Sequence, residues 1–131
     1  MEILAVCHTI IVENKKGNVV YNASSPDELA LVNGAKFFGF NFKGRDDESD
    51  LIVENNGEET KFKLLNLIEF TSTRKRMTVI VRTSDDRILV MCKGADSIIT
   101  PRLKPNQKIL EQTLQYLDQY AKEGLRTLLL A

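Results

Sequence analysis

Three strand-like runs joined by short polar connections occupy the centre of this sequence, and they limit its possible folds more than any other feature. The runs at 61–70, 76–83 and 87–93 contain many β-branched and apolar side chains, as strands do. The polar connections between them are only a few residues long, which is typical of antiparallel neighbours. The sequence therefore predicts an antiparallel meander.

A meander brings two residues that are distant in sequence to one edge of the sheet. Its first and third strands run in the same direction, so we expect Phe70 and Lys93 on the same rim. Two strand spacings would separate them by about 10 Å. That distance suits an adenine ring with its ribose.

The segment before the meander predicts a hairpin. Residues 3–13 are apolar and β-branched and predict a buried strand. A polar, glycine-containing turn is expected at 14–18, and 19–21 would form the returning strand.

A helix is expected next, because its start and its end both have clear signals. Ser25 suits the N-cap, Pro26 the first helical position and Glu28 the third, which together form a capping box. Gly39 is the expected end of this helix, and 40–43 would be a short strand.

The C-terminal part predicts two helices and a strand. A short helix is expected at 94–100, and Pro105 or Asn106 would open a longer one that Gly124 ends. The spacing of its apolar positions predicts one buried stripe, made of Leu110, Leu114, Leu117 and Ala121. Residues 125–131 predict an apolar strand at the chain end.

These elements together predict a single α+β domain over residues 1–131, a twisted antiparallel sheet flanked by helices. Natural termini usually become polar, so the abrupt apolar end suggests a domain excised from a larger protein. Lysine plus arginine and aspartate plus glutamate both total 18, which argues against a general nucleic-acid binder. No apolar run approaches the roughly 20 residues that span a bilayer, so this fragment is not expected to insert into a membrane.

Familiar catalytic and phosphate motifs are absent, including the P-loop and the dinucleotide fingerprint. Cys7 and Cys92 are expected to be buried, reduced thiols, and His8 a hydrogen-bonded core or edge residue. The acidic loop at 45–50 lacks the spacing of a calcium site. No catalytic or metal-ligating residue is therefore predicted in this fragment.

Five sequence blocks, in order, cover nearly the whole chain and resemble the nucleotide-binding domain of the phospholipid-flipping P-type ATPases. They are AVCHT at 5–9, YNASSPDE at 21–28, FTSTRKRM at 70–77, CKGAD at 92–96 and EGLRTL at 123–128. The chain departs from the family pattern at Val12, where proline is common, and at Leu29, where a small or acidic residue is usual. The DKTGT segment with its phosphorylated aspartate is absent, as is the hinge motif with a magnesium-binding aspartate.

The resemblance implies a P-type ATPase N-domain fold that captures ATP and presents it to an aspartate in a separate phosphorylation domain. Mg²⁺ would accompany the nucleotide and find its ligands outside this fragment, so the isolated domain is not expected to hydrolyse ATP. The parent would be an integral membrane ATPase that moves phospholipid between leaflets, with this domain on the cytoplasmic side. Its partners would be the phosphorylation and actuator domains of the same chain and an accessory subunit.

Two alternatives to this function remain open. One is the nucleotide-binding domain of another P-type subgroup. The other is a non-catalytic interaction module that keeps the fold but has lost nucleotide binding.

By the same resemblance, Phe70 is the platform on which adenine stacks and Lys93 is a cation beside the adenosine and phosphates. Gly94 lets the backbone approach closely. Arg126 reaches the phosphates, for which a guanidinium is suited, although it could instead interact with a helix C-terminus.

Three further assignments stay open between a structural and a binding role. Glu28 either only completes the capping box or also accepts from the adenine amino group. Ser72 is either a turn hydroxyl or a hydrogen-bonding partner of the nucleotide. The basic run at 74–76 is either a solvated turn or a source of phosphate contacts.

Overall fold

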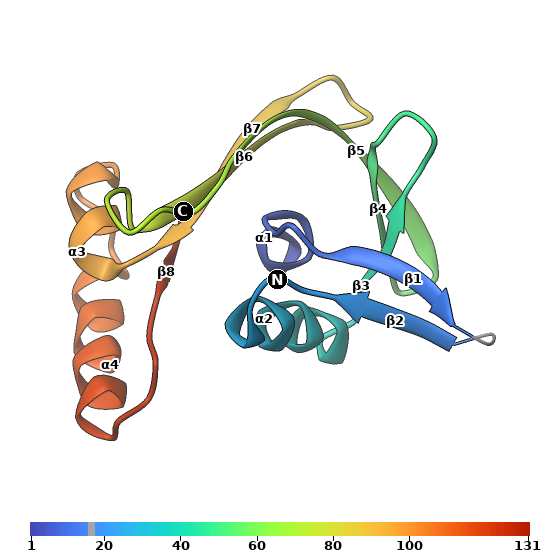
Figure 1. Cartoon of the computed structure of the whole chain (residues 1–131). Coiled ribbons are helices and arrows are strands. Elements are labelled where there is room, and N and C mark those ends of the chain that lie inside the picture. Colours follow the sequence, from blue (N-terminus) through green and yellow to red (C-terminus); the bar gives the residue numbers. More distant parts are fainter. Residues whose placement is uncertain (16–17) are drawn as a thin grey trace.

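The central meander is present in the computed structural model, which describes residues 1–15 and 18–131 (Figure 1). A six-stranded antiparallel sheet has the order β3-β4-β5-β6-β7-β8, so each strand pairs with its neighbour in sequence. The strands are β3 Phe40–Arg45, β4 Leu51–Asn55, β5 Glu58–Ile68, β6 Arg76–Arg82, β7 Ile88–Gly94 and β8 Leu129–Leu130. The predicted α+β class with a twisted antiparallel sheet is confirmed.

A separate hairpin and four α-helices complete the fold (Figure 1). The hairpin strands are β1 Ile11–Lys15 and β2 Asn18–Asn22, and the helices are α1 Glu2–Val6, α2 Pro26–Phe37, α3 Asp96–Ile99 and α4 Leu110–Lys122, with a 3-10 turn at Thr100–Arg102. The predicted pairing of the hairpin is confirmed. Its predicted turn includes residues 16–17, which lie outside the described residues.

The predicted strand at 3–13 is wrong in its first half, where the chain forms the helix α1. Three consecutive residues, Leu4, Ala5 and Val6, are all buried. A strand with one solvated face would expose every second side chain, but α1 packs against α2, β3 and β4, which enclose it. Tertiary packing therefore overrides the β-branched composition, and the strand begins only at Ile11.

The predicted helix at 25–38 is confirmed as α2, with Ser25 as its N-cap and Pro26 in its first turn. Gly39 follows the helix with a φ of 91°, a conformation that glycine adopts readily. The sequence analysis missed strand β4. Its turn into β5 is Asn56-Gly57, with both residues at positive φ, the usual chemistry of a two-residue hairpin.

The hydrophobic core lies between α1, α2 and one face of the sheet. Its largest fully buried members include Phe42, Phe62, Ile10 and Leu51. His8 is also fully buried, not in a strand but just after α1, where Nε2 donates to the Ala5 carbonyl and Nδ1 accepts from the Ile10 N–H. Burial lowers the pKa of His8 to about 4, so the ring is neutral near pH 7. Cys7 is buried and Cys92 is partly exposed, and both are free thiols.

The long C-terminal helix differs from its prediction in start and packing. α4 begins at Leu110 rather than at Pro105 or Asn106, because Asn106 has a φ of 61°, which a right-handed helix cannot contain. The predicted stripe is not buried: Leu110, Leu114 and Leu117 are half-buried and Ala121 is exposed. Figure 1 shows α4 standing apart from the core, beside the segment that leads to β8.

The predicted strand at 125–131 is reduced to β8, Leu129–Leu130. Ala131 still exchanges two backbone hydrogen bonds with Cys92, at 2.7 and 2.8 Å. Within the described part of the chain, no helix has the length and apolar character needed to cross a membrane.

Candidate functional site

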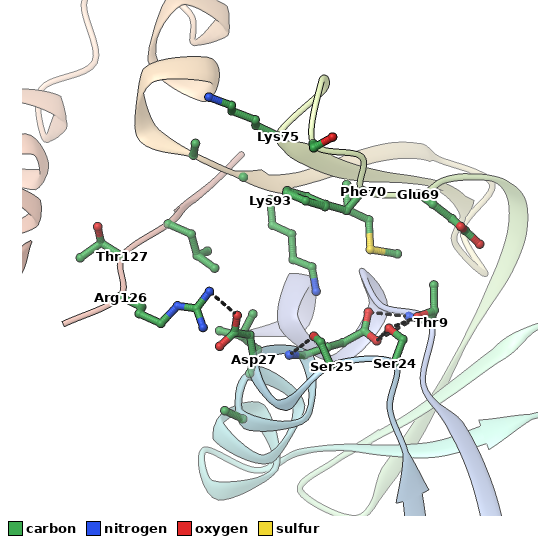
Figure 2. Close-up of a pocket in the computed structure, with 18 residues that line it drawn as sticks. Thr9, Ser24, Ser25, Asp27, Glu69, Phe70, Lys75, Lys93, Arg126 and Thr127 are labelled. Carbon is green, nitrogen blue, oxygen red and sulfur yellow. Dashed lines mark hydrogen bonds and ion pairs between the residues drawn. The ribbon is translucent and has the colours of Figure 1, made fainter.

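A cleft of about 1020 Å³ lies between one rim of the sheet and the N-terminus of α2 (Figure 2). The rim is formed by the end of β5, the loop into β6, and the end of β7, and the segment before β8 closes one side. All six residues predicted for the site line this cleft, namely Glu28, Phe70, Ser72, Lys93, Gly94 and Arg126. The structure thus brings together residues from four separate blocks of sequence.

Phe70 lies just beyond the end of β5, and its side chain is 61% exposed. Its loop is held by Arg74, whose Nη1 donates to the carbonyl oxygens of Ile68 and Glu69 at 3.3 and 3.0 Å. The residues of the basic run at 74–76 therefore have different roles. Arg74 holds the loop in place, whereas Lys75 lines the cleft. Ser72 lies in the exposed turn of the same loop. This arrangement presents an aromatic face to the cleft instead of the core.

Lys93 shares the rim with Phe70 but is only 8% exposed. It lies opposite Met77 in the β6–β7 ladder, and Figure 2 shows its side chain extending from the rim toward α2. Among the described residues, its ammonium group has no hydrogen-bond or ion-pair partner. Burial lowers the pKa of Lys93, and the charge of Glu28 counteracts part of that effect. No fully buried side-chain nitrogen or oxygen of the described residues lacks a hydrogen-bond partner, so the unpaired Lys93 ammonium keeps access to the cleft. There it is available to an anionic or hydrogen-bond-accepting ligand.

Glu28 is buried below the cleft and accepts three hydrogen bonds. Oε1 accepts from the Thr9 N–H at 2.9 Å, and Oε2 accepts from the Thr9 and Ser24 hydroxyls at 2.8 and 3.0 Å. Burial alone would raise the pKa of Glu28, but these hydrogen bonds and the charge of Lys93 lower it overall. An ionised carboxylate has about four acceptor positions, and these hydrogen bonds occupy three of them.

The capping box is only half formed. The Glu28 backbone N–H donates to Ser25 Oγ at 3.2 Å, as predicted for an N-cap. The Glu28 side chain does not return to Ser25, however, but bonds the segment after α1 through Thr9. Its structural role is therefore to join that segment to α2.

Gly94 is required by the spacing of the two strands at the rim. A Cβ atom at this position would lie 2.6 Å from both the Arg76 Cβ and the Lys75 carbonyl oxygen. Another part of the chain therefore does approach the Gly94 backbone closely, as predicted. That part is the start of strand β6 and the residue before it.

Arg126 reaches across the mouth of the cleft to the first turn of α2. Its Nη2 lies 2.8 Å from Asp27 Oδ2, with the two side chains 85% and 51% exposed (Figure 2). Arg126 follows Gly124, whose φ is 80°, in a segment outside any helix or strand. From the sequence, a helix C-terminus or phosphates were the expected partners of Arg126, and this carboxylate was not predicted.

Sequence reasoning also missed Thr9 as a lining residue, and within the basic run at 74–76 it did not single out Lys75. Thr9 had no local signal, because its position was assigned to a strand that does not form. Across residues 1–15 and 18–131, the structure shows no group of three or more His, Cys, Asp or Glu side chains suited to a metal ion.

Comparison with known proteins gives a consistent result. The family model described as "P-type ATPase, cytoplasmic domain N" matches residues 1–131. The chain is 47% identical over 135 residues to the phospholipid-transporting ATPase DRS2 of Saccharomyces cerevisiae, covering 100% of this chain and 10% of that protein. It is 45% identical over 129 residues to phospholipid-transporting ATPase IC of Xenopus tropicalis, covering 98% and 10%.

A plant relative, probable phospholipid-transporting ATPase 5 of Arabidopsis thaliana, is 50% identical over 137 residues, covering 98% of this chain and 11% of its own length. The chain thus spans about a tenth of the length of the curated relatives it matches.

Proposed function

This chain belongs to the family of P-type ATPase cytoplasmic N domains, and we propose from that premise that it captures ATP and presents it to an aspartate on a separate phosphorylation domain. The parent protein would use the resulting aspartyl-phosphate to drive phospholipid from one leaflet to the other. Residues 1–131 would be one domain of this enzyme, with the phosphorylation and actuator domains and an accessory subunit as its partners.

The observation that carries this proposal is the pairing of Phe70 and Lys93 on one rim of the cleft. An exposed aromatic face can stack on a base, an interaction worth about 1–3 kcal/mol. The Lys93 ammonium has no hydrogen-bond or ion-pair partner among the described residues and keeps access to the cleft, so it would supply a charge for the acceptor atoms of the nucleotide. A ligand with a flat aromatic ring and an anionic tail would stack on Phe70 and pair with Lys93 at the same time.

Glu28 gives the cleft a means of choosing adenine. Its one remaining acceptor position would receive the exocyclic amino group of the base. Guanine presents a carbonyl oxygen at the corresponding place, which a carboxylate would repel. In this proposal Glu28 both joins Thr9 to α2 and accepts from adenine, because its structural hydrogen bonds use only three of its acceptor positions.

The phosphates would extend toward Arg126, at the mouth of the cleft. Magnesium needs several oxygen ligands, and the described residues assemble no group of acidic side chains to provide them. The ion would therefore accompany the nucleotide and be held outside these residues. The isolated domain is accordingly expected to bind ATP without hydrolysing it.

Calorimetric titration of the 131-residue chain with ATP tests this function. Phe70→Ala should weaken binding about fivefold to a hundredfold, the loss expected for one stacking contact. Phe37→Ala is the matched control, because Phe37 is 84% exposed and lies outside the cleft. Equal affinities for the two variants would contradict the proposed site. A wild-type chain that binds no ATP would instead support the non-catalytic interaction module.

A further inference from the structure

The ion pair between Asp27 and Arg126 connects two walls of the cleft that belong to distant parts of the chain. Asp27 lies in the first turn of α2, whereas Arg126 belongs to the segment between α4 and β8. Six other ion pairs among the described residues join neighbouring strands, the turns beside them, or successive turns of one helix. Figure 2 shows the Arg126 side chain extended across the opening to meet Asp27.

The two partners differ in how firmly they are placed. Asp27 is carried by the first turn of α2, where the helix dipole favours a negative charge. Arg126 has a long side chain that is 85% exposed, on a backbone segment outside regular structure. Arg126 therefore has more freedom to reach other partners, whereas Asp27 keeps its charge on α2 at the mouth of the cleft.

An exposed pair of this kind is weak, because water and salt screen it. A polyphosphate carries several negative charges and binds a guanidinium through paired hydrogen bonds, so it competes effectively for Arg126. When Arg126 turns to the phosphates, Asp27 loses its counter-charge while it remains at the mouth of the cleft. Its carboxylate then repels the same phosphates. An uncharged nucleoside, by contrast, needs neither Arg126 nor the space beside Asp27.

We propose that Asp27 is a specificity-determining residue of this cleft, which holds Arg126 while the cleft is empty and selectively lowers the affinity for phosphate-bearing nucleotides. The proposal rests on the function proposed above, since it concerns how the same cleft treats the two ends of ATP. Its consequence is that ATP is held mainly by its base, with its phosphates held loosely. Loose phosphates suit a domain that must pass a phosphoryl group to another domain.

The test is calorimetric titration of the 131-residue chain with ATP and with adenosine, at low and at high salt. Asp27→Asn should raise the affinity for ATP roughly two- to fivefold at low salt, the change that corresponds to one exposed ion pair. Adenosine affinity should stay the same, and the gain for ATP should shrink at high salt. In an Arg126→Gln background the gain from Asp27→Asn should be smaller, because only the direct repulsion is then removed.

Asp47→Asn is the matched control, since it removes the same charge from an exposed turn outside the cleft. It should leave ATP affinity unchanged. If Asp27→Asn does not fold, Asp27→Ser removes the same charge and keeps a residue suited to a helix start.

The outcomes separate this proposal from the function on which it depends. Measurable ATP binding that Asp27→Asn fails to strengthen would overturn the proposal and leave the proposed function intact. An equal gain for adenosine and ATP would also overturn it, because Asp27 would then act on the shape of the cleft. If neither wild type nor Asp27→Asn bound ATP or adenosine, the proposed function itself would fail, and this proposal with it.

Discussion

The carboxylate of Glu28 holds Thr9 at two points, accepting from its backbone N–H at 2.9 Å and from its hydroxyl at 2.8 Å. This contact joins α2 to the segment that follows α1, and it lies directly below the cleft. The helix cap is independent of it, because Ser25 accepts from the Glu28 backbone N–H and not from its side chain. Substitutions of Glu28 therefore test the contact without removing the cap.

Glu28→Ala should lower the free energy of unfolding by about 1–3 kcal/mol, because the partly buried Thr9 N–H loses its acceptor. ATP affinity should fall as well in the protein that remains folded, if the last acceptor position of Glu28 reads adenine. Urea unfolding followed by ATP titration measures both effects. Glu59→Ala, at an exposed carboxylate of β5, should change neither. A destabilised Glu28→Ala variant with unchanged ATP affinity would restrict Glu28 to its structural role.

His8 makes stability depend on pH. The folded ring has a pKa of about 4, lowered by burial, whereas an unfolded histidine titrates near its ordinary pKa of 6.5. Between these pH values the unfolded chain binds a proton that the folded chain does not. The free energy of unfolding is therefore highest above pH 6.5 and decreases as the pH falls toward 4. The loss at pH 5 should be about 2 kcal/mol relative to pH 7.5.

Proton NMR can follow this effect directly, because His8 is the only histidine in the sequence. Its imidazole should titrate below pH 5 in the folded domain. In a folded His8→Gln variant, the drop in stability from pH 7.5 to pH 5 should be smaller by the same amount. A ring that titrates near 6.5 in the native protein would refute the prediction.

Two glycines should respond oppositely to the same substitution. Gly94→Ala should destabilise the domain by about 1–3 kcal/mol and distort the rim, since the new Cβ would lie 2.6 Å from backbone and side-chain atoms of β6 and the residue before it. Gly34→Ala is the control. It lies within α2 with nothing within 4 Å of its Cβ position, so it should stabilise the helix by about 0.5–1 kcal/mol. Thermal unfolding of both variants makes the comparison, and a tolerated Gly94→Ala would show that the rim can relax.

The sequence predicted the meander and its rim because strand runs with short connections leave few alternatives. For the same reason Phe70 and Lys93 could be placed together before any coordinates. The α1 region could not be predicted, because an apolar β-branched run of this length suits a buried strand or a buried helix equally. Only its enclosure by α2, β3 and β4 decides between them.

Contacts between residues far apart in the chain were harder to predict from the sequence. The spacing of Leu110 and Leu114 gives α4 an apolar face, but periodicity does not show whether another element covers that face. The Asp27–Arg126 pair joins residues with no local relation in sequence, so only the fold reveals it. The six residues predicted for the site share a cleft, but their nucleotide contacts stay a prediction until they are measured.

The last prediction concerns how the cleft divides its affinity between base and phosphates. In the proposed pose Phe70 and Glu28 lie toward the base, Lys93 lies between the base and the phosphates, and Arg126 faces the phosphates from an exposed position. The cleft has no glycine-rich cradle of backbone amides, and the described residues supply no metal group to grip a γ-phosphate. ATP and ADP should therefore bind with affinities within about tenfold of each other, a difference of about 1.4 kcal/mol or less.

Isothermal titration with ATP, ADP and GTP checks this division. Phe70→Ala should weaken ATP binding more than the loss of the γ-phosphate does, because stacking on one aromatic ring contributes about 1–3 kcal/mol. GTP should bind more weakly than ATP, since the ionised Glu28 carboxylate cannot donate a hydrogen bond to the carbonyl oxygen of guanine. Phe37→Ala again serves as the control, with wild-type affinity for all three nucleotides. If ATP bound a hundredfold more tightly than ADP, residues 1–131 would contain a γ-phosphate site, and the division between base and phosphate binding would be wrong.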